Sequence, residues 1–316
     1  MRLYPELPDG PMPGPERVVV LGSFDGVHLG HQQLVSHAVQ LAEEQGLYST
    51  AITFDPLPEA VLAPRTCPPT LMDIDERVAA LRELNPDELF VVKPSPELLG
   101  LPAEVFAEGL LRKRFRAVAV VGGEGFRFGK GRGGDASLLR RLGFRVEEVP
   151  PLEVERAPIS STRIRALVTG GDVEAAGRLL SRPYTLTGVV AHGREVGRTL
   201  GFPTANLRPN PGRQIPARGV YACEALIAGG PGAGEPCPAW RQRNSVVNIG
   251  VRPTFQGEGE YLSVEAHLLD FSEDLYGARL RLVFRHHLRD ERRFANVELL
   301  KEQIERDRRS AEALLD

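Results

Sequence analysis

Two histidines three residues apart form the most specific chemical pattern in the sequence. His28 and His31 lie in the segment GSFDGVHLGH, which follows an apolar run and stands where a helix is expected to begin. At this spacing both imidazoles lean toward one side of the helix. Gly30 lets a phosphate approach the backbone, and a helix N-terminus attracts anions. The pattern predicts a site where two imidazole donors stabilise charge on phosphorus, at about 3–4 kcal/mol per donor.

A second segment, ISSTRIR, ends at Arg165 and also has residue types that suit phosphate binding. Ser161 and Thr162 can hold a phosphate through hydroxyl and backbone N–H groups, and Arg165 can bind it as a planar fork. Both segments have ordinary interpretations as well. The hydroxyls are common N-caps, and a histidine pair is often a surface feature or an adventitious metal site. The flanking glycines and the presence of both segments favour the phosphate interpretation.

The second half of the chain carries a different set of polar residues. The basic, glycine-punctuated segment 192–206 ends in Pro-Thr-Ala-Asn, and in an extended chain Thr204 and Asn206 project to one face. A hydroxyl and an amide oxygen are suitable partial ligands for Mg²⁺. Glu265 lies on the polar face of an alternating strand, where it could act as a general base. The alternatives are a plain turn ending at Asn206 and a solvated carboxylate at Glu265.

The first half of the chain alternates short apolar runs with amphipathic stretches that would position these residues. The expected strands are Arg17–Leu21, Tyr48–Phe54, Glu88–Val92, Ala117–Val121 and Arg145–Val149, with helices at about 31–45, 74–84, 103–115 and 136–142. This alternation predicts an α/β doubly wound parallel sheet. The carboxyl ends of such strands open onto one crevice. The segments 22–31, 54–58 and 122–129, which follow three of the strands, are therefore expected to converge.

From Thr185 onward the apolar period becomes two, which predicts a small antiparallel β-barrel. The expected strands lie at 187–190, 220–227, 245–249, 262–269 and 279–284, and the Gly/Pro-rich stretch 228–239 is expected to be a hairpin loop. From about Ala295 the chain becomes helical, with a stripe expected to pack on the barrel: Val297, Leu300, Ile304, Ala311 and Leu314. The domain boundary is placed near Pro183.

Length and composition limit the class of protein. At 316 residues the chain exceeds what one core usually serves, so two domains are expected. A net charge of −3 and an aromatic content of 6% argue against a nucleic-acid-binding protein. No apolar run approaches the roughly 20 residues of a membrane span. Three widely spaced cysteines indicate neither a disulfide framework nor a zinc knuckle. We therefore expect a cytoplasmic protein that binds neither nucleic acid nor membrane.

The segment Gly129 to Gly134 contains a formal G-x-G-x-x-G pattern. It does not directly follow its strand, because Gly122 to Phe128 intervenes, and no clear acidic residue ends a following strand to hold a ribose. A P-loop is also absent, since Gly131 follows Lys130 where Ser or Thr would be needed. We interpret this stretch as a basic loop near phosphates and not as a dinucleotide fingerprint.

GSFDGVHLGH followed by ISSTRIR resembles the nucleotidyltransferase superfamily, and in detail the N-terminal module of the prokaryotic bifunctional riboflavin kinase/FMN adenylyltransferase family. The resemblance implies that His28 and His31 assist attack on the α-phosphate of ATP, giving FAD and pyrophosphate without a covalent enzyme intermediate. It also implies nucleotide binding by Ser23, Phe24, Asp25, Gly30, Ser161, Thr162 and Arg165. The resemblance further implies flavin binding by Phe54, Pro56 and Phe126. Two positions depart from the family: Gly125 stands where Asp or Asn is usual, and Leu57 where many members have His.

The segments GRTLGFPTAN, VVNIGVRPTF, VEAHLLDFSEDLYG and LRDERRF resemble, in that order, the riboflavin kinase module of the same family. The resemblance implies that Thr204 and Asn206 hold Mg²⁺-ATP and that Glu265 activates the ribityl 5′-hydroxyl. Arg198 matches a basic position that contacts phosphate, and Arg289 lies in the segment that matches the flavin-side flap.

Together these patterns predict a bifunctional enzyme with an FMN adenylyltransferase domain at 1–183 and a riboflavin kinase domain at 184–316. Its ligands would be riboflavin, FMN, ATP and Mg²⁺, with FMN and FAD as products. The alternative keeps the kinase and makes the first domain a regulatory module that only binds nucleotide or flavin, an interpretation that Gly125 alone supports. Self-association is left open.

Overall fold

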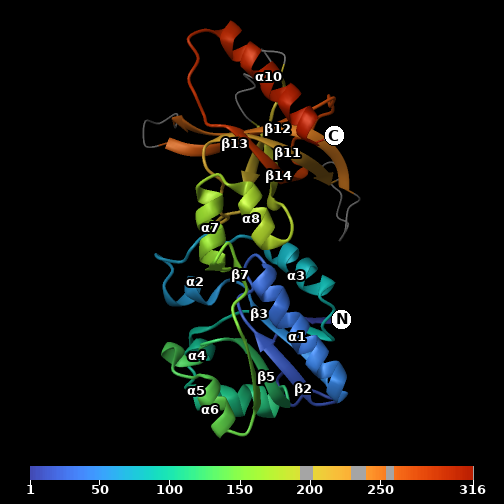
Figure 1. The fold of residues 1–316 in the computed structure, drawn as a ribbon, viewed down its shortest axis with the longest axis vertical. Helices are drawn as coiled ribbons and strands as arrows, with labels where there is room; N and C mark the ends of the chain where they lie inside the picture. The colour runs from blue at the N-terminus through green and yellow to red at the C-terminus, as the bar shows by residue number, and fades with distance from the viewer. Residues whose placement is uncertain (193–201, 229–239, 254–259, 316) are drawn as a thin grey trace. The chain divides into compact units, whose positions relative to one another are not determined.

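A computed structural model describes residues 1–192, 202–228, 240–253 and 260–315 (Figure 1). The chain forms two compact units. The first contains Met1–Thr70 and Ile74–Ser161, and the second contains Leu71–Asp73 and Thr162–Asp316. Among the described helices, none is both long and apolar enough to span a bilayer.

The first unit is built on a six-stranded sheet in the order β1-β4-β3-β2-β5-β6, in which every neighbouring pair is parallel. The strands are β1 (Arg2–Tyr4), β2 (Arg17–Leu21), β3 (Tyr48–Phe54), β4 (Glu88–Val92), β5 (Ala117–Gly123) and β6 (Arg145–Val149). A small antiparallel pair, β7 (Glu153–Val154) and β8 (Ala157–Pro158), lies outside the sheet. The doubly wound parallel sheet predicted from the alternating pattern is confirmed.

Helices connect these strands, as the sequence pattern predicts. They are α1 (Leu29–Gln45), α2 (Pro58–Leu62), α3 (Ile74–Glu83), α4 (Pro96–Leu99), α5 (Ala103–Val105), the π-helix η1 (Phe106–Arg114), the 3₁₀ turn η2 (Lys130–Arg132) and α6 (Ala136–Arg141). Helix α1 contacts β2, β3 and β5 through a buried face that includes Val35, Ala38 and Leu41. It ends at Gly46, whose φ of 65° is the left-handed conformation that favours glycine.

Two features of this unit differ from the expectation. The helix expected at 103–115 is a short α-helix followed by the π-helix η1, which the apolar period cannot distinguish from a continuous α-helix. Strand β1 is not among the expected strands, because three residues carry no recognisable period. Its Tyr4 ring stacks on Phe90 of β4, with 4.4 Å between ring centroids, and this contact fixes β1 at the edge of the sheet.

The second unit contains a closed antiparallel barrel in the order β10-β13-β12-β11-β14-β9, as predicted. Its strands are β9 (Tyr184–Ala191), β10 (Ala205–Pro209), β11 (Gly219–Ala228), β12 (Trp240–Pro253), β13 (Glu260–Leu268) and β14 (Arg279–Arg289). Helices α7 (Ser161–Thr169) and α8 (Val173–Leu180) precede it, and α10 (Val297–Leu315) follows it. The hairpin loop expected at 228–239 lies, apart from Ala228, outside the described residues.

The terminal helix α10 lies against β11 and β12 (Figure 1). Ala311 is fully buried there, in a cluster with Val246 and Leu269. The expected apolar stripe is correct at this residue but wrong at both ends, where Val297 and Leu314 are about half exposed. The helix therefore packs on the barrel through a shorter contact than its sequence suggests.

Helices α7 and α8 pack on the barrel. The Gln214 side chain donates to the Thr169 hydroxyl at 3.0 Å, and the Ala217 N–H donates to the Val168 carbonyl at 3.1 Å. Glu174 of α8 accepts from the His287 N–H at 3.3 Å. Because of these contacts, the boundary between the two compact units lies between Ser161 and Thr162. The functional boundary near Pro183 stays a prediction.

Candidate active sites

In the first unit, His28 and His31 are brought into direct contact at the start of α1. His28 is the N-cap, and its Nδ1 accepts a hydrogen bond from the His31 backbone N–H at 3.3 Å. The two imidazoles stack, with ring centroids 3.6 Å apart, and the Phe24 ring meets His31 edge-on at 5.3 Å. A Cβ at Gly30 would lie 3.3 Å from the His28 ring, so this glycine also leaves room for the imidazole.

The loop before these histidines has a strained backbone. Phe24 and Val27 have φ values of 46° and 38°, a region that bulky and β-branched residues rarely adopt. Gly26 between them has a φ of 86°. Such strain persists only where the surroundings hold it, and it concentrates at functional sites.

Hydrogen bonds to the backbone carbonyls of this loop hold it in place. The Ser23 carbonyl accepts from the Thr53 hydroxyl at 3.0 Å, and the Val27 carbonyl accepts from the Gln32 side chain at 2.9 Å. The Asp25 carbonyl accepts from the Ser161 hydroxyl, also at 2.9 Å. Ser161 thus joins the second predicted phosphate segment to the histidine loop.

Helix α7 begins at Ser161, and Thr162 and Arg165 follow on the same helix. Thr162 is exposed and Arg165 half-buried. By its contacts Ser161 belongs to the first unit, while the other two residues belong to the second. Their assignment to the triphosphate remains a prediction from the resemblance.

The predicted flavin-side residues lie at the end of β3 or shortly after β3 and β5, both of which pair with β2. Phe54 is buried in the core of the first unit, Phe126 packs on that core half-buried, and Pro56 is exposed. A Cβ at Gly122 would collide with the Phe126 ring, so this glycine lets the ring fold back over the end of β5. The pairing places the ends of the three strands at one edge of the sheet, as parallel geometry predicts.

The two positions that depart from the family have different surroundings. Gly125 is exposed, has a φ of 70°, and offers open space to a Cβ. Leu57 is buried and stands as the N-cap of α2 without a side-chain hydrogen bond. Both lie on the side predicted to bind flavin.

In the barrel, three polar residues form a row across neighbouring strands. Asn206 of β10 and Asn248 of β12 are each the direct cross-strand partner of Glu265 on β13. Partners in antiparallel strands share one face of the sheet. The alternation predicted for β13 is confirmed, since Val264, Ala266 and Leu268 are buried toward the barrel core. Asn248 is not among the predicted site residues, although its segment VVNIG carries part of the resemblance, because its register opposite Glu265 is a tertiary feature.

A cavity of about 390 Å³ lies on this outer face of the barrel. It is lined by Glu265, Asn248, Ser263, Thr204 and Arg289, among others. The Ser263 hydroxyl donates to Glu265 Oε1 at 3.2 Å. A Cβ at Gly250 would collide with the Glu291 carboxylate, so Gly250 makes room for the segment after β14. The cavity thus contains the predicted general base together with neutral hydrogen-bonding groups and the charged Arg289.

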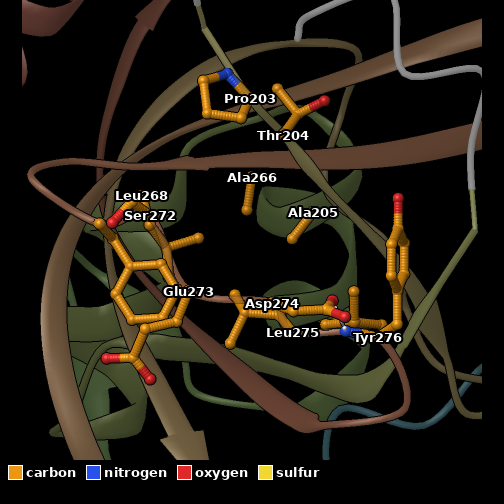
Figure 2. A pocket seen from close by; sticks show the side chains of 12 residues that line it. Pro203, Thr204, Ala205, Ala266, Leu268, Ser272, Glu273, Asp274, Leu275 and Tyr276 are labelled. Atoms are coloured by element: carbon orange, nitrogen blue, oxygen red, sulfur yellow. Dashed lines mark hydrogen bonds between the residues drawn. The ribbon is translucent and has the colours of Figure 1, made fainter.

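A second cavity of about 410 Å³ shares Thr204 with the first. Figure 2 shows Pro203 and Thr204 on one side of it and Asp274 and Tyr276 on the other, with Ala205 and Ala266 between them. The His192 and Tyr276 rings stack at 3.7 Å. Glu273 also lines this cavity, and its ion pair with Arg241 lowers the pKa of that carboxyl. Thr204 therefore has access to both cavities.

Arg289, predicted on the flavin side, lines the cavity that contains Glu265. Its guanidinium forms a two-pronged ion pair with the Asp307 carboxylate of α10, with nitrogen–oxygen distances of 2.7 and 3.0 Å. Asp307 is only 5% exposed, and Gln303 donates to it at 2.7 Å. No sequence pattern points to Asp307, because a carboxylate on a charged helix is usually solvated.

Arg198 lies outside the described residues. Within the described ranges, no group of three or more His, Cys, Asp or Glu side chains is arranged to hold a metal ion. Burial raises the pKa of Cys223 well above its usual range, which leaves this thiol protonated inside the barrel. Of the cysteines in the described residues, Cys67 and Cys223 are both free thiols.

Comparison with known proteins gives matches over nearly the whole chain. Residues 12–163 match the family model for FAD synthetase, and residues 180–315 match the model for riboflavin kinase. This chain is also similar to curated proteins named bifunctional riboflavin kinase/FMN adenylyltransferase. The protein from Haemophilus influenzae is 35% identical and the alignment covers 94% of each chain; the one from Bacillus subtilis is 36% identical over 93% of this chain and 91% of its own.

Among solved structures, a crystal structure described as a macrolide-efflux protein from Streptococcus pneumoniae shares the fold across 99% of both chains. The sequence identity is 31% and the TM-score 0.86. Because both halves match catalytic families, a first half that only regulates the kinase is not favoured. The chain belongs to the family of bifunctional riboflavin kinase/FMN adenylyltransferases.

Proposed function

We propose that this chain phosphorylates riboflavin to FMN in its barrel and adenylylates FMN to FAD in its parallel-sheet unit, using ATP in both steps. The observation that carries the proposal is the presence of two polar centres in one chain. One is the stacked pair His28 and His31 at the start of α1, and the other is the cross-strand row around Glu265. Because both steps consume ATP, we also infer a cytoplasmic enzyme.

In the adenylyl transfer, a phosphate oxygen of FMN attacks the α-phosphorus of ATP, a new O–P bond forms, and the bond to pyrophosphate breaks. Positioning and charge stabilisation supply most of the catalysis in such reactions. Nδ1 of His28 accepts the His31 N–H, so the neutral ring carries its proton on Nε2, and we assign this N–H as the donor to a phosphate oxygen. We assign the same donor role to His31, with Ser161, Thr162 and Arg165 holding the remaining phosphates.

The backbone around Ser23, Phe24, Asp25 and Gly30 supplies the rest of the nucleotide site in this proposal. The strained backbone and the hydrogen-bonded carbonyls of this loop fix its conformation before the substrate binds. Binding therefore costs little conformational entropy in the loop. Phe54, Pro56 and Phe126 are assigned to FMN, with the half-buried Phe126 ring offering an aromatic face to the flavin.

In the kinase reaction, the ribityl 5′-hydroxyl attacks the γ-phosphorus of ATP, and ADP leaves. We assign Glu265 as the base that accepts the hydroxyl proton, because it lines a cavity large enough for part of a flavin. The Ser263 hydroxyl, which donates to Oε1, orients the carboxylate. Arg289 and Asn248 would then contact the flavin in the same cavity, and the cavity at Tyr276 would take the adenine nucleotide.

The donor set on β10 and the residue before it suits Mg²⁺. Thr204 supplies a hydroxyl and Asn206 an amide oxygen, and Asn206 pairs with Glu265 across the strands. These are hard oxygen ligands, and Mg²⁺ typically takes a few from protein and the rest from phosphates and water. A bound ion would neutralise charge on the transferred phosphate, while Thr204 and Asn206 hold the nucleotide beside the base. Arg198 is assigned to phosphate from the resemblance.

Product analysis of the full chain tests the proposal. With riboflavin, ATP and Mg²⁺ we expect FMN, ADP, FAD and pyrophosphate, and with FMN as the only flavin we expect FAD and pyrophosphate. FMN without any FAD would contradict the adenylyltransferase assignment and support the regulatory alternative. Omission of Mg²⁺ is expected to abolish kinase activity, and a rate unchanged in the presence of a chelator would remove Thr204 and Asn206 from the metal role.

A further inference from the structure

Arg77 of α3 is a buried cation with no role in the reaction as proposed so far. Its side chain is only 1% exposed. One terminal nitrogen, Nη1, donates to the Phe54 carbonyl at 2.6 Å and to the Ser23 carbonyl at 3.1 Å. The same nitrogen lies 3.3 Å from the Thr53 hydroxyl, which itself donates to the Ser23 carbonyl at 3.0 Å.

These contacts join two loops that serve different substrates in the proposed reaction. Ser23 begins the strained loop that leads to the two histidines. Phe54 is the last residue of β3, where the predicted flavin segment begins. The guanidinium therefore bridges the carboxyl ends of β2 and β3 through backbone atoms, which no change of side chain in either loop would remove.

Burial of a cation is costly unless hydrogen bonds and charge compensate for it. One ion pair of Arg77 is with Asp55, whose carboxylate oxygen lies 3.8 Å from Nη2. Replacement of a buried ion pair by well-packed apolar residues is often neutral or stabilising, so stability alone is a weak reason for a cation at this position. The presence of Arg77 is explained if the reaction needs the geometry that this side chain imposes on the loops at Ser23 and Phe54.

We infer that Arg77 is a positioning residue for adenylyl transfer: it fixes the separation between the nucleotide loop at Ser23 and the flavin loop at Phe54. The inference rests on the proposed function of the first unit. Attack on phosphorus requires the two substrates to meet within a narrow range of distance and angle, and a misplacement of about 1 Å can cost about 100-fold in rate. Each loop still binds its own substrate without the bridge, but the two are no longer held in register.

The test is Arg77→Lys in the full chain, which keeps the charge and loses the planar fork. We expect kcat for FAD formation to fall about 10- to 100-fold, while the KM values for ATP and FMN change less than about threefold. Riboflavin kinase activity in the same preparation should stay at the wild-type level. The matched control is Arg82→Lys, because Arg82 lies on the same helix with an exposed side chain; it should leave both activities unchanged.

A purely structural role predicts something different: a lower melting temperature, with kcat unchanged in protein that is folded at the assay temperature. That result would overturn the inference. If Arg77→Lys does not fold, Thr53→Val tests the same bridge, since it removes only the hydroxyl shared by Arg77 and the Ser23 carbonyl. A smaller loss of kcat with unchanged KM values is then expected, and wild-type kcat would refute the inference.

Failure of this inference can be separated from failure of the proposed function by His31→Ala. If His31→Ala abolishes FAD formation and Arg77→Lys has no effect on kcat, only the positioning role is wrong. If His31→Ala also leaves FAD formation unchanged, the assignment of the site itself is wrong.

Discussion

Nδ1 of His28 accepts a hydrogen bond from the backbone N–H of His31, and their imidazoles lie in stacked contact 3.6 Å apart between centroids. The His28 side chain thus caps helix α1, and the first turn of that helix places His31 beside it. The spacing of the two residues in the sequence is the spacing that this cap requires. Helix capping and the proposed phosphate chemistry therefore share the same residues.

Replacement of His31 separates the two activities of the chain. We expect His31→Ala to lower FAD formation by at least about 100-fold, because a donor to the developing charge on phosphorus is lost. Formation of FMN should continue at the wild-type rate, since the residues proposed for the kinase reaction lie in the barrel. Chromatography of the flavin products from riboflavin and ATP measures both rates at once. Loss of both activities in folded protein would contradict independent sites.

Glu265→Gln should have the opposite effect. The amide cannot accept the proton of the ribityl hydroxyl, so kinase activity is expected to fall by about 100- to 10,000-fold. FAD formation from added FMN should be retained. The matched control is Glu298→Gln, the same change at an exposed position of α10, which should leave kinase activity unchanged. A kinase rate unaffected by Glu265→Gln would exclude this carboxylate as the base.

Asp307→Asn tests the tie between α10 and the segment that carries Arg289. The substitution leaves a partly buried guanidinium without its carboxylate, and we expect a loss of up to about 3 kcal/mol in the free energy of unfolding. The KM for riboflavin should rise while FAD formation from FMN is unchanged. Glu302→Gln on the same helix removes only an exposed ion pair with Arg306 and should change stability by less than about 1 kcal/mol. Equal effects of the two substitutions in urea titrations would contradict the proposed tie.

Gly125→Asn tests the departure from the family pattern on the flavin side. Asn tolerates a positive φ better than most residues, and its Cβ would meet open space, so the fold should be retained. We expect a lower KM for FMN in FAD formation, because position 125 directly precedes Phe126 on the side predicted to bind flavin. Gly125→Ala carries the same backbone strain without a polar group and should give no such gain. A KM for FMN that is the same in both variants would show that this position does not contact the flavin.

Periodicity and motif spacing by themselves determined much of the architecture. The buried strands β2, β3 and β4 begin and end at the predicted residues, because parallel strands covered on both faces need nearly continuous apolar runs. The alternation of Val264, Ala266 and Leu268 likewise predicted which face of β13 is buried. The spacing of His28 and His31 predicted their approach at a helix start. Local rules suffice for these features, since neighbours in sequence decide them.

Only the tertiary structure decided which distant residues meet. Arg77 reaches a carbonyl 54 residues away, and Arg289 pairs with Asp307 on a separate helix. Asn248 stands opposite Glu265 because of the register between β12 and β13. Such contacts depend on strand order and on the packing of helices, so each residue looks like an ordinary polar or charged side chain in the sequence. Candidate catalytic residues that lie within one segment could be recognised from their residue types and spacing. The residues that orient them come from other segments, so they could be identified only from the fold that brings those segments together.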